Sequence, residues 1–336
     1  MKPFPCVALA MMSALMGCAS VDPPSKPAGT EDLVFGPGGG IDHVLLWTRE
    51  VEQDTAVLRD RLGFNVVPGG SFPDQVANRL IYFGNESYLE LLHFTVPLSQ
   101  LEPARLEDMK FLQDRDGSIG FGIRVDDLER MAGKLAASGL ETTDVSPGSF
   151  DPDGPTGPEA AKEALFRTMG FKERLMAGLD PFFVWYAPWP ALTSEGRAQW
   201  ETTTSHRNTA QRPSAVWILP TDTAIARSVL EKVGYTPGRN VDMPQIGARG
   251  TVFDAGRTSI VLIEPEKEGL AADALRLRGP HVVGISLEVT DLAAASDVIS
   301  DGYGSSPQRY EGPFGESVMA PSQEDLGLLI EFHAAR

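Results

Sequence analysis

Two predicted strands each carry one side chain that could do chemistry: His43 within residues 40–47 and Glu90 within residues 87–94. Because side chains alternate across a strand, each of the two projects from a face that is otherwise apolar. Burying a carboxylate on such a face is costly unless it is paired or binds a metal. Imidazole and carboxylate groups are metal ligands, and they also accept protons. The sequence therefore predicts a metal site, or an acid–base site, at His43 and Glu90.

The same two residues have a simpler interpretation. A core histidine is often just hydrogen-bonded, so His43 and Glu90 could form a structural polar pair. A metal held by these two alone also lacks the third protein ligand of a facial triad, which a loop, His206 or the substrate would have to supply. Two interpretations stay open: a metal site in which Glu90 is a ligand or a catalytic base, and a buried polar pair.

His281 and Glu331 are weaker candidates for the same kind of site. His281 precedes by three positions the point on its strand where a ligand would fall, which favours a strand-end or loop residue. Glu331 lies on the last predicted strand. Two interpretations of Glu331 stay open: it occupies a metal-ligand position, or it faces water.

Three aromatic residues, Trp47, Tyr88 and Trp185, lie on strands near the candidate site. Core packing would explain them. If the interior is open, they instead form an apolar wall for a small molecule, as in most ligand pockets.

The strands that carry these residues belong to a repeated pattern. Four times along the chain, a strand is followed by a helix and then by further strands. Such a βαβββ unit cannot bury its own sheet, so units pair. The sequence predicts an α+β fold of four tandem units in two half-open barrels, over residues 41–200 and 210–336.

Residues 146–180 form an insert within the second of these units. Its first part is rich in Pro and Gly, and residues 159–179 show apolar positions at helical spacing. We expect a helix there, which either covers the mouth of the barrel or packs on the surface.

The N-terminal residues predict export and a lipid anchor. A short apolar run, too short to span a membrane, is typical of a signal peptide over residues 1–17. The ending Leu15-Met16-Gly17-Cys18 resembles a bacterial lipobox, whose Cys becomes the acylated first residue. We therefore predict a lipid on Cys18, a flexible tether over residues 18–40, and a place in the cell envelope, at the outer membrane facing the periplasm. An ordinary signal peptide cut nearby is the alternative.

Composition narrows the partners. The two cysteines, Cys6 and Cys18, both lie at the N-terminus, so the rest of the chain has neither a disulfide nor a thiol nucleophile. The formal net charge of −17 argues against nucleic acid, which requires a basic surface. It also argues against a broad contact with anionic lipids. A small molecule remains the expected partner, with the lipid anchor as the only membrane contact.

Several motifs together resemble the vicinal-oxygen-chelate superfamily, closest to its glyoxalase-like branch. They are Ile41-Asp42-His43-Val44, Leu62-Gly63-Phe64, Pro68-Gly69-Gly70, Gly84-x-x-x-Tyr88-Leu89-Glu90-Leu91 and the spacer His206-x-Asn208. The resemblance implies paired-unit barrels that can hold a divalent metal between the first and last strands of their units. By position it makes His43 and Glu90 ligands of the first unit. The later units offer, in order, Gly120 with Trp185 or its neighbour, Ala215 with Val261, and Gly284 with Glu331.

Two functions follow from this resemblance. Superfamily members include glyoxalases, extradiol dioxygenases and epimerases, which implies a divalent-metal-dependent lyase, isomerase or dioxygenase acting on a small oxygenated substrate. They also include metal-free binding proteins, which the missing second-unit ligands favour. A third interpretation is a scaffold without a site.

Overall fold

The computed structural model describes most of the chain from residue 35 onward. The described ranges are 35–36, 38–72, 75–101, 103, 106, 109–148, 164–188, 192–254 and 256–335. The predicted signal peptide, Cys18 and most of the tether lie outside the described residues. Within these ranges, no helix combines the length and the apolar character needed to cross a membrane.

The first unit begins at β1 and ends at β4. Its elements are β1 (Gly40–Trp47), α2 (Val51–Ala56), the π-helical turn η1 (Val57–Arg61), β2 (Val67–Phe72), β3 (Val76–Tyr82) and β4 (Tyr88–Phe94). Gly63 follows the helical segment with φ +76°, a backbone conformation that favours glycine. A β-carbon there would also lie 2.7 Å from Val298 Cγ1 of the fourth unit. Gly63 therefore allows both the turn out of the helix and the close approach of the fourth unit.

The second unit has the same order of elements. They are β5 (Gly117–Arg124), α4 (Leu128–Ala137), β6 (Ser146–Gly148), β7 (Phe166–Met169) and β8 (Asp180–Tyr186). Asp127 caps α4 by accepting a hydrogen bond from the Arg130 N–H. The helix expected over residues 159–179 is wrong for its described part, because residues 166–169 pair with β8 as a strand. The two ends of the predicted insert are therefore strands of the unit itself, and residues 149–163 lie outside the described part.

The third and fourth units repeat the pattern. The third unit contains β9 (Ala210–Leu219), α7 (Thr223–Val233), β10 (Thr236–Met243), β11 (Ala248–Asp254) and β12 (Ser259–Pro265). The fourth contains β13 (His281–Val289), α9 (Leu292–Tyr303), β14 (Arg309–Gly312), β15 (Gly315–Ala320) and β16 (Leu329–Ala334). Asp222 and Asp291 cap α7 and α9 through two backbone N–H groups each. The same sequence signal, Asp after a strand, thus starts the helices of units two to four.

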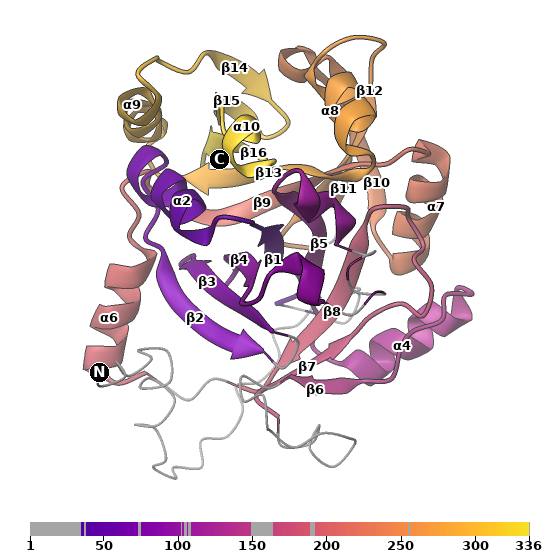
Figure 1. Ribbon diagram of the computed structural model, residues 1–336. Helices are drawn as coiled ribbons and strands as arrows, with labels where there is room; N and C mark the ends of the chain where they lie inside the picture. Colours follow the sequence, from indigo (N-terminus) through magenta and orange to yellow (C-terminus); the bar gives the residue numbers. More distant parts are fainter. Residues whose placement is uncertain are drawn as a thin grey trace.

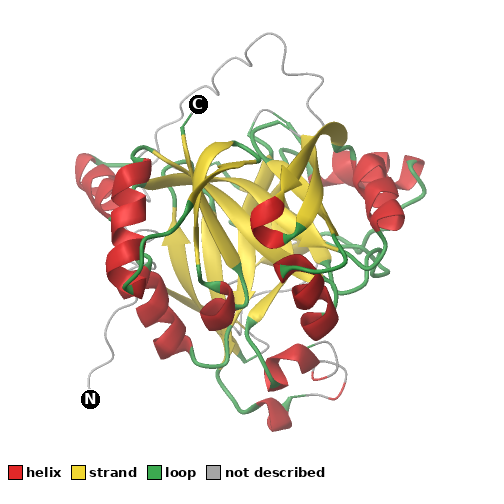
Figure 2. Ribbon diagram, turned by 90° about the horizontal axis from the view of Figure 1, so that it is seen from above, coloured by secondary structure: helices red, strands yellow, loops and turns green. Residues whose placement is uncertain are grey.

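Shorter elements connect and cover the units. They are η2 (Leu98–Gln100), η3 (Lys110–Gln113), α6 (Ser194–Thr204), η4 (Pro244–Ile246), α8 (Leu270–Arg278) and α10 (Gln323–Leu326). Figure 2 shows the strands gathered in the middle of the molecule with helices around them.

Strand pairing builds two barrels from the described units. In every unit the first and last strands pair in parallel, and the first strands of paired units, β1 with β5 and β9 with β13, pair antiparallel. The first barrel has the order β2-β3-β4-β1-β5-β8-β7-β6, and the second has β10-β11-β12-β9-β13-β16-β15-β14. Ser118 of β5 and Val282 of β13 pair where the two barrels meet.

The main core lies between the outer faces of the barrels and their helices. One continuous apolar cluster includes Leu58, Phe121 and Ile285, and it extends across both barrels. Phe64 and Phe332, one from each barrel, stack at 6.0 Å between ring centroids. Figure 1 shows α9 beside the end of α2, where α9 also contacts η1. Each fully buried side chain of this size contributes about 1.5–3 kcal/mol, so this shared core fixes the barrels to each other.

Candidate functional site

A β-bulge in β1 brings Asp42 and His43 to the same face. Ile41 pairs with Ile123 and His43 pairs with Gly122, the neighbouring residue of β5. Asp42 is therefore an extra residue in β1 with no partner in β5. Alternation along a regular strand would send Asp42 to the outer face, but a bulge re-aims its side chain. Asp42 Oδ1 and His43 Nδ1 are 2.7 Å apart, and both side chains are buried.

Gly122 makes room for the His43 ring. A β-carbon at Gly122 would lie 2.4 Å from His43 Cε1, closer than real contacts allow. The ring stacks on Tyr88, with centroids 4.4 Å apart and planes inclined by 8°, and Phe182 contacts it edge-on. Gly122 lies opposite His43 in the register of β1 and β5, and it supplies space for the ring.

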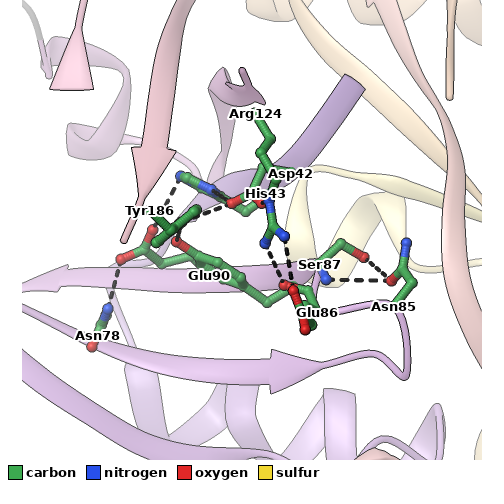
Figure 3. Close-up of polar contacts among 10 residues, drawn as sticks. Asp42, His43, Asn78, Asn85, Glu86, Ser87, Glu90, Arg124 and Tyr186 are labelled. Atoms are coloured by element: carbon green, nitrogen blue, oxygen red, sulfur yellow. Dashed lines mark hydrogen bonds and ion pairs between the residues drawn. The ribbon is translucent and has the colours of Figure 1, made fainter. Parts of the chain in front are cut away.

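Asp42 is held as a carboxylate by three donors. Besides His43, Arg124 Nε donates to Oδ2 at 2.6 Å and the Tyr186 hydroxyl donates to Oδ1 at 2.8 Å (Figure 3). Burial would raise the pKa of Asp42, but the hydrogen bonds from His43 and Tyr186 and the charge of Arg124 together hold it below the usual value. A carboxylate only accepts hydrogen bonds, so His43 carries its proton on Nδ1. In the neutral ring, Nε2 is therefore a bare lone pair.

Glu90 faces that lone pair from the neighbouring strand β4. Glu90 Oε2 lies 3.8 Å from His43 Nε2, too far for a hydrogen bond. The other oxygen, Oε1, accepts from Asn78 Nδ2 at 2.6 Å, and Asn78 Oδ1 in turn accepts from the Gly70 N–H at 2.7 Å. Burial raises the pKa of Glu90, against the opposing effects of His43 and Asn78. Glu90 is therefore oriented by Asn78 and takes up a proton more readily than an exposed glutamate does.

Two phenols extend the network from Asp42. Since Tyr186 donates to Asp42, the Tyr88 hydroxyl, 3.1 Å away, donates to Tyr186. Burial raises the pKa of both phenols well above the usual value, so both keep their protons at neutral pH. The Arg124 guanidinium lies 4.9 Å from the centre of the Tyr186 ring, and its Nη1 donates to Glu86 at 3.0 Å. The result is a rigid hydrogen-bonded chain that ends on the carboxylate fixing His43.

The donor set fits a divalent ion held by two protein ligands. His43 Nε2 and Glu90 Oε2 point toward each other without a hydrogen bond between them. A carboxylate on the second ring nitrogen, as Asp42 is here, is the usual outer-shell partner of a metal-bound histidine. No cluster of three or more His, Cys, Asp or Glu side chains is placed to hold a metal in the described part of the chain. Further ligands would have to be water or substrate.

The predicted aromatic wall is only partly present at this site. Tyr88 belongs to it through its stacking on His43. Trp47 lies inside the first barrel but stacks on Phe94 at 5.1 Å, within a separate apolar cluster. The pocket role predicted for Trp185 is wrong: its ring packs against Arg167 at 4.3 Å and the outer core. Alternation along β8 directs its neighbours Phe182 and Tyr186 inward instead.

His206 is not placed at this site. Its Nδ1 accepts from the Asn65 N–H at 3.1 Å, and its Nε2 donates to the Tyr82 carbonyl at 3.0 Å. Burial lowers its pKa to about 4. Both ring nitrogens are therefore occupied, and the predicted spacer fastens the inter-barrel connection to the first unit. Asn208 does the same by donating to the Leu62 carbonyl at 2.7 Å.

His281 and Glu331 also lie elsewhere. His281 begins β13, where its Nδ1 donates to the Gly279 carbonyl at 2.7 Å. Glu331 is fully buried inside the second barrel. The interpretation in which it faces water is therefore wrong. Glu331 accepts from Ser286 Oγ at 2.8 Å and from the Tyr310 hydroxyl at 2.5 Å. Burial raises the pKa of Glu331 to about 7, against the opposing hydrogen bonds of Tyr310 and Ser286.

The second barrel reverses the arrangement of the first. By register, Glu331 occupies the place of Glu90, Gly284 that of His43, and Trp217 that of Gly122. A ring from β9 thus fills the space that His43 fills from β1, and a β-carbon at Gly284 would lie 2.9 Å from Trp217. Trp217, Val261 and Ser286 are completely buried. The second interior is therefore packed.

The first interior is more accessible. The side chains around His43 and Glu90 that remain partly exposed are Leu45, Tyr88, Phe182 and Tyr186. Polar groups on a partly exposed aromatic face are typical of a small-molecule site.

Comparison with known proteins agrees with this fold. Residues 41–234 match a family described as the glyoxalase-like domain. The match covers more than half of the chain, which therefore belongs to this family, within the vicinal-oxygen-chelate superfamily. No curated protein sequence matches the chain.

Solved structures with similar folds span nearly the whole chain. A mutant of 4-hydroxymandelate synthase from Streptomyces coelicolor aligns with a TM-score of 0.60 and 14% identity, covering 89% of this chain and 93% of that one. The 2,3-dioxygenase LapB from Pseudomonas sp. KL28 aligns with 0.54 and 15%, covering 88% and 91%. A hypothetical protein from Staphylococcus aureus aligns with 0.54 and 11%, covering 88% and 99%. At these identities the likeness shows the fold.

Sequence reasoning missed four members of the site: Asp42, Asn78, Arg124 and Tyr186. Asp42 stands next to His43, but only the bulge makes the two neighbours face the same way. Tyr186 stands next to Trp185 and, four residues after Phe182, lies on the same face of the strand as Phe182. An Arg at the end of a strand and an Asn within one carry no comparable signal.

Proposed function

We propose that the first barrel is an enzyme site for a small oxygenated molecule, and that His43 and Glu90 hold a divalent metal ion there. The observation that carries the proposal is the pair of facing donors, His43 Nε2 and Glu90 Oε2, 3.8 Å apart without a hydrogen bond. Two lone pairs brought together in a buried site favour a cation between them. Asp42 already fixes the other nitrogen of His43, at 2.7 Å.

The residues of this chain would divide the work. Asp42 accepts from His43 Nδ1 and so turns Nε2 toward the ion, and Asn78 fixes the rotation of the Glu90 carboxylate. Glu90, with its raised pKa, can take a proton from a substrate and return it. When bound, the ion would act as a Lewis acid on a substrate oxygen.

The wall of the site supports an aromatic substrate of the dioxygenase type. Tyr88, Phe182 and Tyr186 present partly exposed rings beside the polar pair. Proteins whose names specify a 2,3-dioxygenase and a 4-hydroxymandelate synthase share the fold. A flat oxygenated ring fits both facts.

Thermal unfolding with and without Mn²⁺ and a chelator tests this function. We expect added Mn²⁺ to raise the melting temperature of the wild type, and His43→Ala to abolish that response. His93→Ala is the matched control, because His93 lies on the same strand as Glu90 but at odd parity, on the other face. If the wild type does not respond to metal, or if His43→Ala responds as the wild type does, the metal site does not exist.

A metal-free binding module is the second candidate. It is favoured by the second unit, which contributes Gly122 and Tyr186 at this level instead of ligands. In that case the same experiment shows no metal response, and aromatic ligands alone raise the melting temperature.

We also propose that the protein is a lipoprotein of the cell envelope, acylated at Cys18. The proposal is supported by the lipobox-like ending Leu15-Met16-Gly17-Cys18 behind a short apolar run. Cys18→Ser should release the protein from the membrane fraction or block its processing. A variant that stays as membrane-bound as the wild type would refute the anchor.

A further inference from the structure

A cavity lies at the junction of the two barrels. Its volume is about 520 Å³, within the range of small-molecule pockets, and it opens where β5 and β13 begin. None of its lining residues belongs to the site at His43 and Glu90. Along β5, Ser118 in its wall is separated from Gly122 beside His43 by roughly 13 Å. It is therefore a place for a different ligand.

The lining is strongly cationic. Lys110, Arg115, Arg174 and Arg278 line the cavity, against one carboxylate among the described lining residues, that of Asp116. In a chain with a formal net charge of −17, such a concentration of positive charge is a local exception. Clefts lined by one sign of charge focus the field and attract counter-charged ligands.

Two of these cations, Arg115 and Arg278, have neutral carbonyl groups as their hydrogen-bond partners among the described residues. Arg115 Nη2 donates to the Arg278 carbonyl at 2.6 Å, and Arg278 donates to the carbonyls of Asp116 and Gln323 at 2.9 and 3.2 Å. The Asp116 carboxylate accepts instead from the N–H and Nε of Arg49. Burial lowers the pKa of Arg278, and the charge of Arg115 nearby lowers it further.

The rest of the wall is apolar or neutral. Phe111, Ile119 and Pro280 line the same cavity. Burial lowers the pKa of His281 to about 4, so its ring is neutral there at pH 7. Its Nδ1–H is used by Gly279, and its Nε2 has no hydrogen-bond partner among the described residues. An apolar body can therefore sit beside the cationic groups.

We propose that this cavity binds a small organic anion, an apolar or aromatic body carrying a carboxylate or a phosphate, with Arg115 and Arg278 as its principal partners. Guanidinium groups match the two oxygens of such anions in fork geometry. Phe111, Ile119 and Pro280 cover the apolar part of the ligand. The proposal is independent of the metal site in the first barrel.

Calorimetric titration of the full chain with benzoate, phenyl phosphate and benzamide tests this site. Benzamide has the shape of benzoate without its charge. We expect at least one of the two anions to bind, with benzamide about tenfold or more weaker, as the loss of a charge-assisted hydrogen bond implies. Binding of benzoate alone would assign a carboxylate, and binding of phenyl phosphate alone a phosphate ester. If neither anion binds, or if benzamide binds equally well, the proposal is wrong.

Substitutions then locate the binding. Arg115→Gln and Arg278→Gln should each weaken anion binding about tenfold or more. Arg276→Gln is the matched control on the same helix, because Arg276 is exposed and pairs with Asp273. Arg278 also anchors two carbonyls, so Lys110→Gln, at an exposed position, provides a variant that keeps the fold. It should weaken binding, and its effect should shrink with added salt. Unchanged binding in Arg115→Gln and Lys110→Gln would overturn the assignment.

Discussion

Replacing Asp42 with Asn tests whether this carboxylate organises the first-barrel site. Asp42 accepts three hydrogen bonds, from His43, Arg124 and Tyr186, at 2.6 to 2.8 Å. The amide keeps the volume but turns one acceptor into a donor, and it removes the charge that balances Arg124. Hydrogen bonds to charged groups contribute about 1.5–3 kcal/mol each, and breaking a buried ion pair costs about 3–5 kcal/mol. Because Arg124 retains Glu86, we expect Asp42→Asn to lower the free energy of unfolding by about 3 kcal/mol at pH 7.

Urea unfolding of the wild type, Asp42→Asn and the control Glu86→Gln measures this effect. Glu86 is the exposed partner of the same Arg124, so its loss should change the free energy of unfolding by less than about 1 kcal/mol. The pKa of Asp42 is lowered in the fold, so its contribution is complete above the unfolded carboxyl pKa of about 3.9. The contribution is lost as pH falls through the still lower folded pKa. Equal effects of Asp42→Asn and Glu86→Gln at pH 7 would refute the central role of Asp42.

Two further substitutions test the two barrels separately. Gly122→Ala places a β-carbon 2.4 Å from His43 Cε1, so the His43 ring must move. We expect this variant to bind Mn²⁺ about tenfold or more weakly and to lose about 1–3 kcal/mol of folding free energy. Unchanged Mn²⁺ affinity in calorimetry would show that the ring position is irrelevant. Glu331 has a pKa raised from 4.5 to about 7, so its destabilising ionisation grows as pH rises from 4.5 through 7. Glu331→Gln should therefore gain stability relative to wild type between pH 4 and pH 9, by about 3 kcal/mol in urea unfolding, and a pH-independent difference would contradict the burial argument.

The α+β fold could be predicted because its signals are local and repeated. Asp127, Asp222 and Asp291 each follow a strand and start a helix, and the apolar strands around His43 and Glu90 set which residues share a face. The expected helix over 159–179 failed where tertiary pairing decides the structure. Residues 166–169 join β8 as a strand despite their helical spacing.

The site could be predicted only as far as strand periodicity holds. His43 and Glu90 lie together on paired neighbouring strands, as alternation predicts. Asp42 could not be assigned to them, because a bulge depends on the partner strand and leaves no mark in this segment. The failure for Trp185 has a different cause. Its strand was predicted, but not the face of the strand: Tyr186 points into the barrel, so its neighbour Trp185 points outward.

The number of Mn²⁺ ions bound per chain tests the central claim most directly. Calorimetric titration at pH 7.5 should give one ion per wild-type chain, and none in His43→Ala or Glu90→Gln. Glu331→Gln, which alters the corresponding glutamate of the packed second barrel, should bind as the wild type does. Absence of stoichiometric binding in the wild type, or equal binding in His43→Ala and Glu90→Gln, would contradict a metal site at His43 and Glu90.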